Sequence, residues 1–298
     1  MAVYVCDVML CRNPFVKDRS GKFIRLSVLT GDPDLRLYSQ PFPCGQCLPC
    51  RINRRRVWTH RLILERTLWT DACFVTLTYD DEHLPPHGVD KDEVQRFLKR
   101  LRKAIAPLKI RYYLCAEYGE HTLRPHYHAI FFNLSESYAQ LIANCWSYGG
   151  VCVGSATPDS MQYVAGYITK KLVKSALAKY GFAPEFSLMS RKPGLGSGVV
   201  DSIIEVLRGY VPDQATSVDL PPGLLHSRRL LPFGRYLRSK IELAFGVDIV
   251  SSPQILQQYC DFLSSKTGID FTDYLVRSDD GRAESIKARY TIYTRSIL

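Results

Sequence analysis

The chain has 298 residues, of which 46% are hydrophobic, so it can bury a sizeable core, and global disorder is not expected. Its net charge of +10 favours a polyanionic partner such as nucleic acid over an acidic-surface or membrane role. No apolar run approaches the ~20 residues of a membrane span, and residues 1–7 lack a basic, apolar leader pattern, so we expect a cytoplasmic protein with no membrane partner.

The first motif in the chain is C-x₂-C-x₂-C, formed by Cys44, Cys47 and Cys50 after an irregular stretch over residues 1–43. In a reducing compartment, thiolates at this spacing favour a structural Zn²⁺ over disulfides. Buried free thiols and an iron–sulfur cluster are the alternatives. The sequence offers three candidates for the fourth ligand: Cys11, Cys6 and His60.

A run of arginines follows the cysteines, at the start of a helix that we expect to reach about Trp69: Arg51, Arg54, Arg55 and Arg56. Beside a metal-bound turn we predict that they contact DNA phosphates, and the alternative is a solvated helix face. Arg191 and Lys192 precede a glycine-rich stretch at residues 193–198, which predicts a flexible loop. These two side chains are further candidate contacts to the DNA backbone.

The middle of the chain alternates between strand and helix patterns. Residues 74–79, 110–117, 126–132 and 151–153 predict strands. Helices are predicted from Asp90 as N-cap to about Pro107, over residues 135–146, and from Thr157 to about Lys179. Adjacent strands favour antiparallel pairing, so the order predicts an α+β sandwich with a mostly antiparallel sheet. Further on, residues 230–245 and 253–265 predict helices.

His126 and His128 alternate along a predicted strand, so they share one face about 7 Å apart at ~3.4 Å per residue. Glu117 ends the preceding strand, and a turn over residues 118–124 would bring it beside His126. Two imidazoles and a carboxylate with open positions suit Mg²⁺, Mn²⁺ or a similar ion. Glu120 and His121 are weaker candidates within the turn, and two surface histidines are the alternative.

Tyr163 and Tyr167 stand four residues apart on the helix predicted from Thr157, so they share a face. Lys170 lies on the same face, and Lys171 lies near its edge. A phenol with a pKa of about 10 is a poor nucleophile. A metal-activated phosphate makes it adequate, and a lysine can stabilise the developing charge. The alternative is a pair of tyrosines packed into the core.

Three motifs in order resemble motifs I, II and III of HUH endonucleases, the rolling-circle replication initiators: FVTLTY at 74–79, PHYH at 125–128 and YVAGYITKK at 163–171. Residues 44–56 and 190–196 look like the replication initiators of gokushovirus-type microviruses, which are small circular single-stranded DNA phages. The resemblance covers most of residues 40–240. Gly166, inside the third motif, is unfavourable in a helix by up to about 1 kcal/mol relative to alanine, and it permits close approach of DNA or a neighbouring strand.

The resemblance implies an α+β fold of the HUH-endonuclease, RRM-like type, with a five-stranded antiparallel sheet, flanking helices and the histidine strand near its centre. His126, His128 and a third ligand, for which Glu117 fits by position, would hold Mg²⁺ or Mn²⁺. One tyrosine would cut single-stranded DNA at the viral origin, leaving a 5′-phosphotyrosine and a 3′-OH, and the second would act after one round. The implied setting is the cytoplasm of a bacterial host, with the host replication polymerase and helicase as partners.

Three segments follow: a cysteine-rich basic segment over residues 1–70, a nuclease core over 71–180, and a helical and loop extension over 181–298 with candidate DNA contacts. Two other interpretations stay open. One is a plasmid relaxase or two-tyrosine transposase of the same superfamily, and the other is a zinc-stabilised DNA-binding protein without catalysis.

Overall fold

A computed structural model of the chain describes residues 11, 15–17, 20–25, 42–119, 121–170, 181–209, 221, 223–226 and 229–245. The chain divides into two compact units, one of Arg55–Asp213 with Leu225–Gly246 and the other of Met1–Arg54, Gln214–Leu224 and Val247–Leu298. Within the described residues, no helix is both long enough and apolar enough to cross a membrane. The three segments predicted from sequence stay a prediction.

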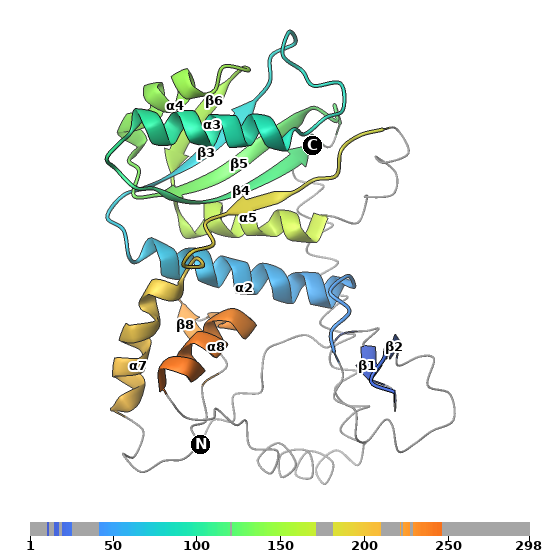
Figure 1. Cartoon of the computed structure of the whole chain (residues 1–298), viewed down its shortest axis with the longest axis vertical. Coiled ribbons are helices and arrows are strands. Elements are labelled where there is room, and N and C mark those ends of the chain that lie inside the picture. The colour runs from blue at the N-terminus through green and yellow to red at the C-terminus, as the bar shows by residue number, and fades with distance from the viewer. Residues whose placement is uncertain are drawn as a thin grey trace. The chain divides into compact units, whose positions relative to one another are not determined.

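A five-stranded sheet forms the centre of the larger unit (Figure 1). Its strands are β3 (Ala72–Thr78), β4 (Arg111–Tyr118), β5 (Pro125–Phe132), β6 (Val151–Ser155) and β7 (Ser187–Met189). Their order is β6-β3-β5-β4-β7, and every neighbouring pair is antiparallel. The predicted α+β fold with a five-stranded antiparallel sheet is therefore confirmed, and the histidine strand β5 is its central strand.

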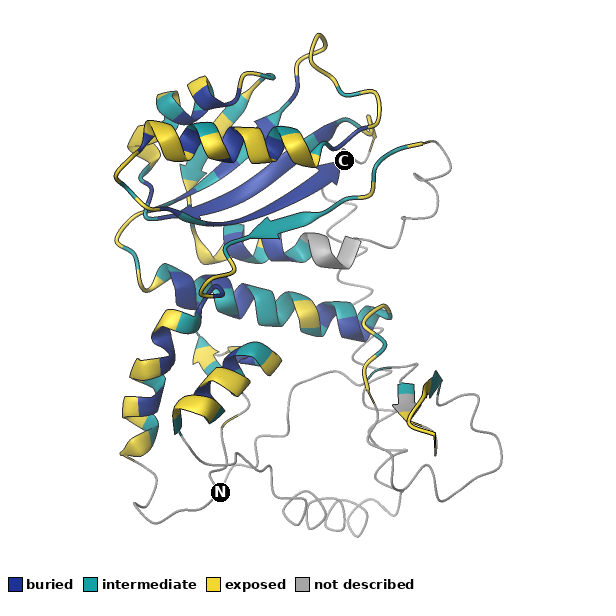
Figure 2. Cartoon of the chain, viewed as in Figure 1, coloured by how far each residue is buried: buried dark blue, intermediate teal, exposed yellow. Residues whose placement is uncertain are grey.

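Helices cover both faces of this sheet (Figure 1). On one face, α3 (Lys91–Ala104) and α4 (Ala139–Cys145) build a first core with Val75, Leu77 and Phe131. On the other face, α5 (Pro158–Lys170) and part of α2 (Leu48–Arg66) build a second core with Tyr113, Ile130 and others. Figure 2 shows β4 and β5 buried along almost their whole length, while α3 alternates between buried and exposed residues. Strand alternation thus separates two apolar faces.

The predicted starts of α3 and α5 are confirmed in their hydrogen bonds. The Asp90 carboxylate accepts from the amides of Asp92 and Glu93 at 2.7 and 2.9 Å. Thr157 and Ser160 cap α5 reciprocally, because Ser160 N donates to Thr157 Oγ1 at 3.2 Å and Thr157 N donates to Ser160 Oγ at 2.8 Å. These side chains satisfy amides that have no partner within the helix.

Several short elements differ from the expectations. Residues 1–43 were expected to be irregular, yet β1 (Phe15–Lys17) and β2 (Phe23–Arg25) pair there. The helix predicted over residues 230–245 is shorter: Arg229–Pro232 forms β9, paired with β8 (Gly223–His226), and α8 is Gly234–Phe245. Gly234 has a φ of +66°, which interrupts a right-handed helix. Residues 135–146 comprise a 3₁₀ turn at Glu136–Tyr138 before α4. The helix predicted over 253–265 lies outside the described residues.

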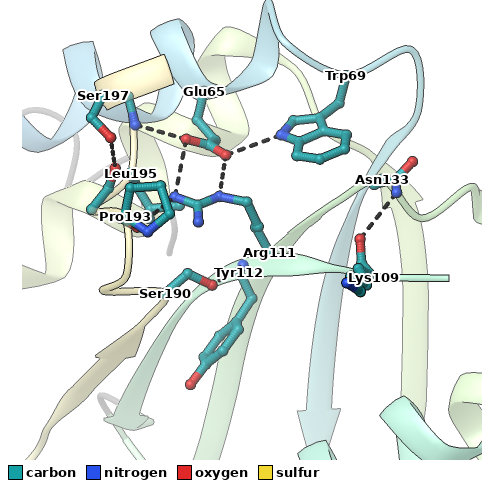
Figure 3. A network of polar contacts seen from close by, with 12 residues as sticks. Glu65, Trp69, Lys109, Arg111, Tyr112, Asn133, Ser190, Pro193, Leu195 and Ser197 are labelled. Atoms are coloured by element: carbon teal, nitrogen blue, oxygen red, sulfur yellow. Dashed lines mark hydrogen bonds and ion pairs between the residues drawn. The ribbon is translucent and has the colours of Figure 1, made fainter. Parts of the chain in front are cut away.

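The glycine-rich stretch at 193–198 was predicted to be a flexible loop, and this prediction is wrong. It leads into a 3₁₀ turn at Ser197–Val199 and then α7 (Val200–Arg208), and Gly194, Leu195 and Gly196 are buried. Gly196 N donates to Glu65 Oε2 at 2.7 Å, and Arg111 Nη2 donates to the Pro193 carbonyl at 2.9 Å (Figure 3).

The same network joins the end of α2 to the start of β4 (Figure 3). Glu65 is almost fully buried, and its carboxylate accepts from Arg111 Nε at 2.5 Å and from Trp69 Nε1 at 3.0 Å. A buried carboxylate needs such partners to offset its lost hydration. Gly196 has a φ of +77°, and a Cβ there would lie 3.0 Å from the Arg61 carbonyl oxygen. The loop therefore needs glycine at this position.

Candidate active site

Glu117, His126 and His128 lie together on the face of the sheet that α5 covers. Glu117 pairs in register with His126, as the predicted turn requires, and His128 is the next residue on that face of β5. Glu117 Oε2 lies 3.4 Å from His126 Nε2 and 3.8 Å from His128 Nε2. Glu117 and His128 are buried, whereas the His126 side chain retains 21% of its exposure. Of the weaker candidates, His121 is exposed in the turn and Glu120 lies outside the described residues.

Hydrogen bonds at the Nδ1 atoms orient both imidazoles. His126 Nδ1 lies 3.1 Å from the Arg124 carbonyl oxygen, which can only accept, so this nitrogen carries the proton. The lone pair of His126 therefore resides on Nε2, which faces Glu117. His128 Nδ1 lies 3.0 Å from Thr76 Oγ1, and its Nε2 also faces Glu117. Thr76 comes from β3, where it pairs in register with His128. The sequence analysis assigned no role to Thr76, although its place in motif I on the same sheet face was a usable signal.

This donor set fits one divalent cation. The three ligand atoms lie within 4.8 Å of one another. Adjacent ligands of an octahedral ion with bonds of about 2.1 Å lie about 3.0 Å apart, so the measured 3.4 and 3.8 Å require only small adjustments. Three protein ligands leave further coordination positions for oxygens of a phosphate or of water. Fixing the unligated ring nitrogen is also the usual way in which proteins orient a metal-binding histidine.

Tyr163 projects from α5 beside this cluster. Its ring centroid is 5.3 Å from that of His128 and 6.3 Å from that of Phe74, and the tyrosine is 48% exposed. Phe74 in turn stacks on His128 with an interplanar angle of 10°. Met161, Val164 and Ala165 bury the other side of α5 in the second core. The helix is thus anchored by these three residues while Tyr163 stays accessible at the cation-binding cluster.

The remaining motif III residues are only partly described. Tyr167 and Lys170 belong to α5, but their side chains are not described, and Lys171 lies outside the described residues. Gly166 is described. A Cβ placed there would lie 3.4 Å from Arg55 Nε and 3.5 Å from Arg55 Cζ. The close approach that Gly166 permits is therefore that of the Arg55 guanidinium from α2.

The arginines on α2 have different surroundings. Arg54 is exposed, Arg51 and Arg55 are half-buried, and Arg56 Nη2 donates to the Leu230 carbonyl of β9 at 2.7 Å. Arg191 and Lys192 are exposed after β7. They sit near Arg111, and Arg111 and Glu117 lie at opposite ends of β4, about 20 Å apart at ~3.4 Å per residue. The structure therefore brings Arg55 to the tyrosine helix but keeps Arg191 and Lys192 away from the histidines.

The four cysteines Cys11, Cys44, Cys47 and Cys50 form a second cluster, within the smaller unit. Their sulfurs also lie within 4.8 Å of one another. Although partial burial raises the pKa of Cys44, hydrogen bonds from the amides of Cys47 and Gln46 outweigh it and lower this pKa to about 6. Of the other candidates for a fourth ligand, Cys6 lies outside the described residues. His60 is buried in the larger unit beside Pro232, and it is not part of this cluster.

Comparisons with known proteins agree with the motifs. Residues 72–172 match the family described as replication-associated protein ORF2, or gene 2 protein. The chain is 33% identical over 201 residues to replication-associated protein VP4 of Bdellovibrio phage phiMH2K, which covers 59% of this chain and 63% of the relative. It is 33% identical over 177 residues to replication-associated protein ORF2 of Spiroplasma virus 4, covering 51% and 55% of the two chains.

A third relative is replication-associated protein ORF4 of Chlamydia phage 1, at 29% identity over 167 residues, covering 49% of this chain and 42% of the relative. The matched parts thus span less than two thirds of each of these relatives. No solved structure matches the chain. All three relatives come from microviruses, so the predicted resemblance to the replication proteins of these phages is confirmed.

Proposed function

We propose that this relative of phage replication-associated proteins initiates rolling-circle replication by nicking and rejoining single-stranded DNA at the viral origin. The observation that carries the proposal is the placement of Tyr163 beside His128, with its ring 5.3 Å from the imidazole of a cation-binding cluster. A tyrosine packed only for stability would not need 48% exposure at a cluster of ligands.

Glu117, His126 and His128 would hold a Mg²⁺ or Mn²⁺ ion, which when bound polarises the scissile phosphate and neutralises part of its charge. Tyr163 lies beside that position, and Tyr167 follows it by one turn on α5. The phenol oxygen of one tyrosine attacks the phosphorus, the P–O3′ bond breaks, and the departing 3′ oxygen takes up a proton. The phenol proton passes to solvent.

The products are a 5′-phosphotyrosine and a free 3′-OH, which a host polymerase can extend. The phosphotyrosine keeps the free energy of the phosphodiester, so attack by a 3′-OH rejoins the strand without ATP. Lys170 and Lys171 are proposed to stabilise the charge that develops on the phenol and phosphate oxygens. Arg55 at Gly166 is a further cation at the tyrosine helix.

The test is formation of a covalent protein–DNA species. The full-length protein is incubated with Mn²⁺ or Mg²⁺ and a single-stranded library that carries a randomised insert, and adducts are captured on a denaturing gel and sequenced. We expect adducts at one preferred sequence, with a polymerase-extendable 3′-OH on the released fragment. His126→Ala and His128→Ala should bind DNA but form no adduct. DNA binding without any adduct in the wild-type protein would instead support the non-catalytic alternative.

A further inference from the structure

A second metal site, separate from the histidine cluster, is built from four cysteines in the smaller unit. Cys11 precedes Cys44 by 33 residues, and Cys44, Cys47 and Cys50 form the turn that leads into α2. All four are free thiols, and the printed sulfur separations exceed any disulfide bond: Cys44 Sγ lies 4.0 Å from Cys50 Sγ, and Cys47 Sγ lies 3.8 Å from Cys11 Sγ.

These separations match the geometry of one tetrahedral ion. Zn–S bonds of about 2.3 Å at tetrahedral angles place neighbouring sulfurs about 3.8 Å apart. The measured 3.8 and 4.0 Å agree with this value, and all four sulfurs lie within 4.8 Å of one another. A cluster of two or four irons bridged by sulfide holds its cysteine sulfurs further apart than a single ion does. The arrangement therefore favours one ion over an iron–sulfur cluster.

Backbone amides point at the sulfurs, as charged thiolates require. Cys47 N and Gln46 N lie 3.3 and 3.4 Å from Cys44 Sγ, and Cys44 N lies 3.2 Å from Cys11 Sγ. Gly45, at φ +72°, turns the chain so that the two amides after it face back toward Cys44. Four thiolates around a divalent ion leave two negative charges, and the start of α2 and the nearby Arg51 and Arg54 lie where they can compensate.

We propose that Cys11, Cys44, Cys47 and Cys50 bind one structural Zn²⁺ that holds the N-terminal residues to the first turn of α2. Zinc is the ion for a closed, four-thiolate tetrahedral site, because it has no redox chemistry to disturb the fold. Without an ion, the four thiols have little to offset the entropy of closing the loop between Cys11 and Cys44. The zinc site thereby stabilises the helix turn that presents Arg51 and Arg54.

The test is the metal content of the full-length protein after purification in reducing buffer, measured by elemental analysis. We expect about one zinc per chain in the wild type and a severalfold loss in Cys11→Ser, Cys44→Ser, Cys47→Ser and Cys50→Ser. Cys152→Ser is the matched control, because Cys152 is an exposed cysteine on β6, and it should keep its zinc. The Tyr163→Phe/Tyr167→Phe double variant should keep it too, so a failure of the nicking proposal is distinguishable from a failure of this one.

A second measurement needs no variant to fold. Replacing zinc by Co²⁺ in the wild-type protein should give thiolate-to-cobalt charge transfer and the intense visible bands of a tetrahedral ion, at an intensity that indicates four thiolates. Zinc-free wild-type protein, iron in place of zinc, or an octahedral cobalt spectrum would each overturn the proposal. Full zinc content in Cys11→Ser would overturn the assignment of the fourth ligand.

Discussion

Glu117 has the most constrained chemistry of any residue at the cation-binding cluster, since it is a buried carboxylate placed between two imidazoles. Removing it takes away the only negative charge among the three proposed ligands. We expect Glu117→Ala to raise the Mn²⁺ concentration needed for half-maximal nicking by tenfold or more, measured by titrating the metal in the adduct assay. His121→Ala, a change in the exposed turn, is the control. If Glu120→Ala has this effect and Glu117→Ala does not, the carboxylate ligand has been misassigned.

Thr76 acts through His128, because its hydroxyl lies 3.0 Å from Nδ1 of that histidine. Thr76→Val keeps the shape of the side chain but removes the hydrogen-bond partner that orients the ring. Loss of such a partner weakens metal affinity by roughly 10–100-fold, so the metal titration should shift by that factor while activity at saturating metal recovers. Thr78→Val on the same strand is the matched control, since the Thr78 hydroxyl bonds the Gly150 carbonyl. A Thr76→Ser variant that titrates like Thr76→Val would contradict the role of the hydroxyl.

Arg54 and Arg56 separate DNA contact from structure, although they are two residues apart. Arg54 is exposed, whereas Arg56 donates to the Leu230 carbonyl at 2.7 Å. We expect Arg54→Ala to weaken single-stranded DNA binding and to reduce the slope of log affinity against log salt by about 0.7, with unchanged stability. Arg56→Ala should instead lower the free energy of unfolding by about 1.5–3 kcal/mol. Salt-dependent binding and denaturant unfolding measure the two effects, and equal salt slopes in all three proteins would remove Arg54 from the interface.

At the scale of elements, α2 and the β8–β9 hairpin meet at a pair of buried histidines. His60 Nδ1 donates to the Pro232 carbonyl at 2.9 Å, and its ring lies 4.9 Å from that of His226. Burial lowers the pKa of His60 to about 4, and burial also lowers the pKa of His226. Both rings are therefore neutral in the folded protein near neutral pH.

This pairing predicts a loss of stability in acid. Between the unfolded value of about 6.5 and the folded value of about 4, the unfolded chain binds a proton at His60 that the folded chain does not. The free energy of unfolding should therefore fall as the pH drops through this window, by up to about 3 kcal/mol from His60. His60→Asn keeps an N–H for the Pro232 carbonyl but does not titrate. Denaturant unfolding of both proteins from pH 7.5 to 4.5 measures the difference, and parallel pH profiles would refute the assignment.

The elements that could be predicted from sequence are those with a local cause. Strand alternation puts His126 and His128 on one face wherever the strand lies, and a turn of few residues leaves Glu117 little choice of register. The cap residues of α3 and α5 act within one helical turn. For these reasons the sheet, its central strand and the juxtaposition of the three proposed ligands follow from the pattern of residues.

The elements that could not be predicted depend on distant partners. Ser187–Met189 is a strand because β4 offers it an edge, and three residues have no detectable period. Leu195 and Gly196 are buried because Glu65 and Arg111, far away in sequence, bind their loop. Glycines there are needed for a close approach to α2, which resembles the composition of a flexible loop. Thr76 and Arg55 were likewise recognisable only once β3 and α2 had been placed beside β5 and α5.

At the scale of the whole molecule, replication requires two cuts by one protein. The first tyrosine stays bonded to the parental 5′ end through a complete round, so the second cut needs another nucleophile. Tyr79 and Tyr127 are unsuitable because both are buried on the opposite face of the sheet, where burial raises the pKa of Tyr127 to about 12 and that of Tyr79 further. Tyr79 also donates to Glu93 Oε2 at 2.6 Å. The candidates are therefore Tyr163 and Tyr167.

Replacing either tyrosine by phenylalanine removes the hydroxyl but keeps the ring that packs beside Phe74 and His128. Each single variant should still form an adduct on a short oligonucleotide, to unequal extents, because one nucleophile suffices for one cut. The double variant Tyr163→Phe/Tyr167→Phe should form none. On a circular template with a polymerase and a helicase, each single variant should start a round but release few unit-length circles. An adduct in the double variant would move the nucleophile elsewhere. A single variant that completes rounds unaided would mean that one tyrosine serves both cuts, and that the other contributes only packing to α5.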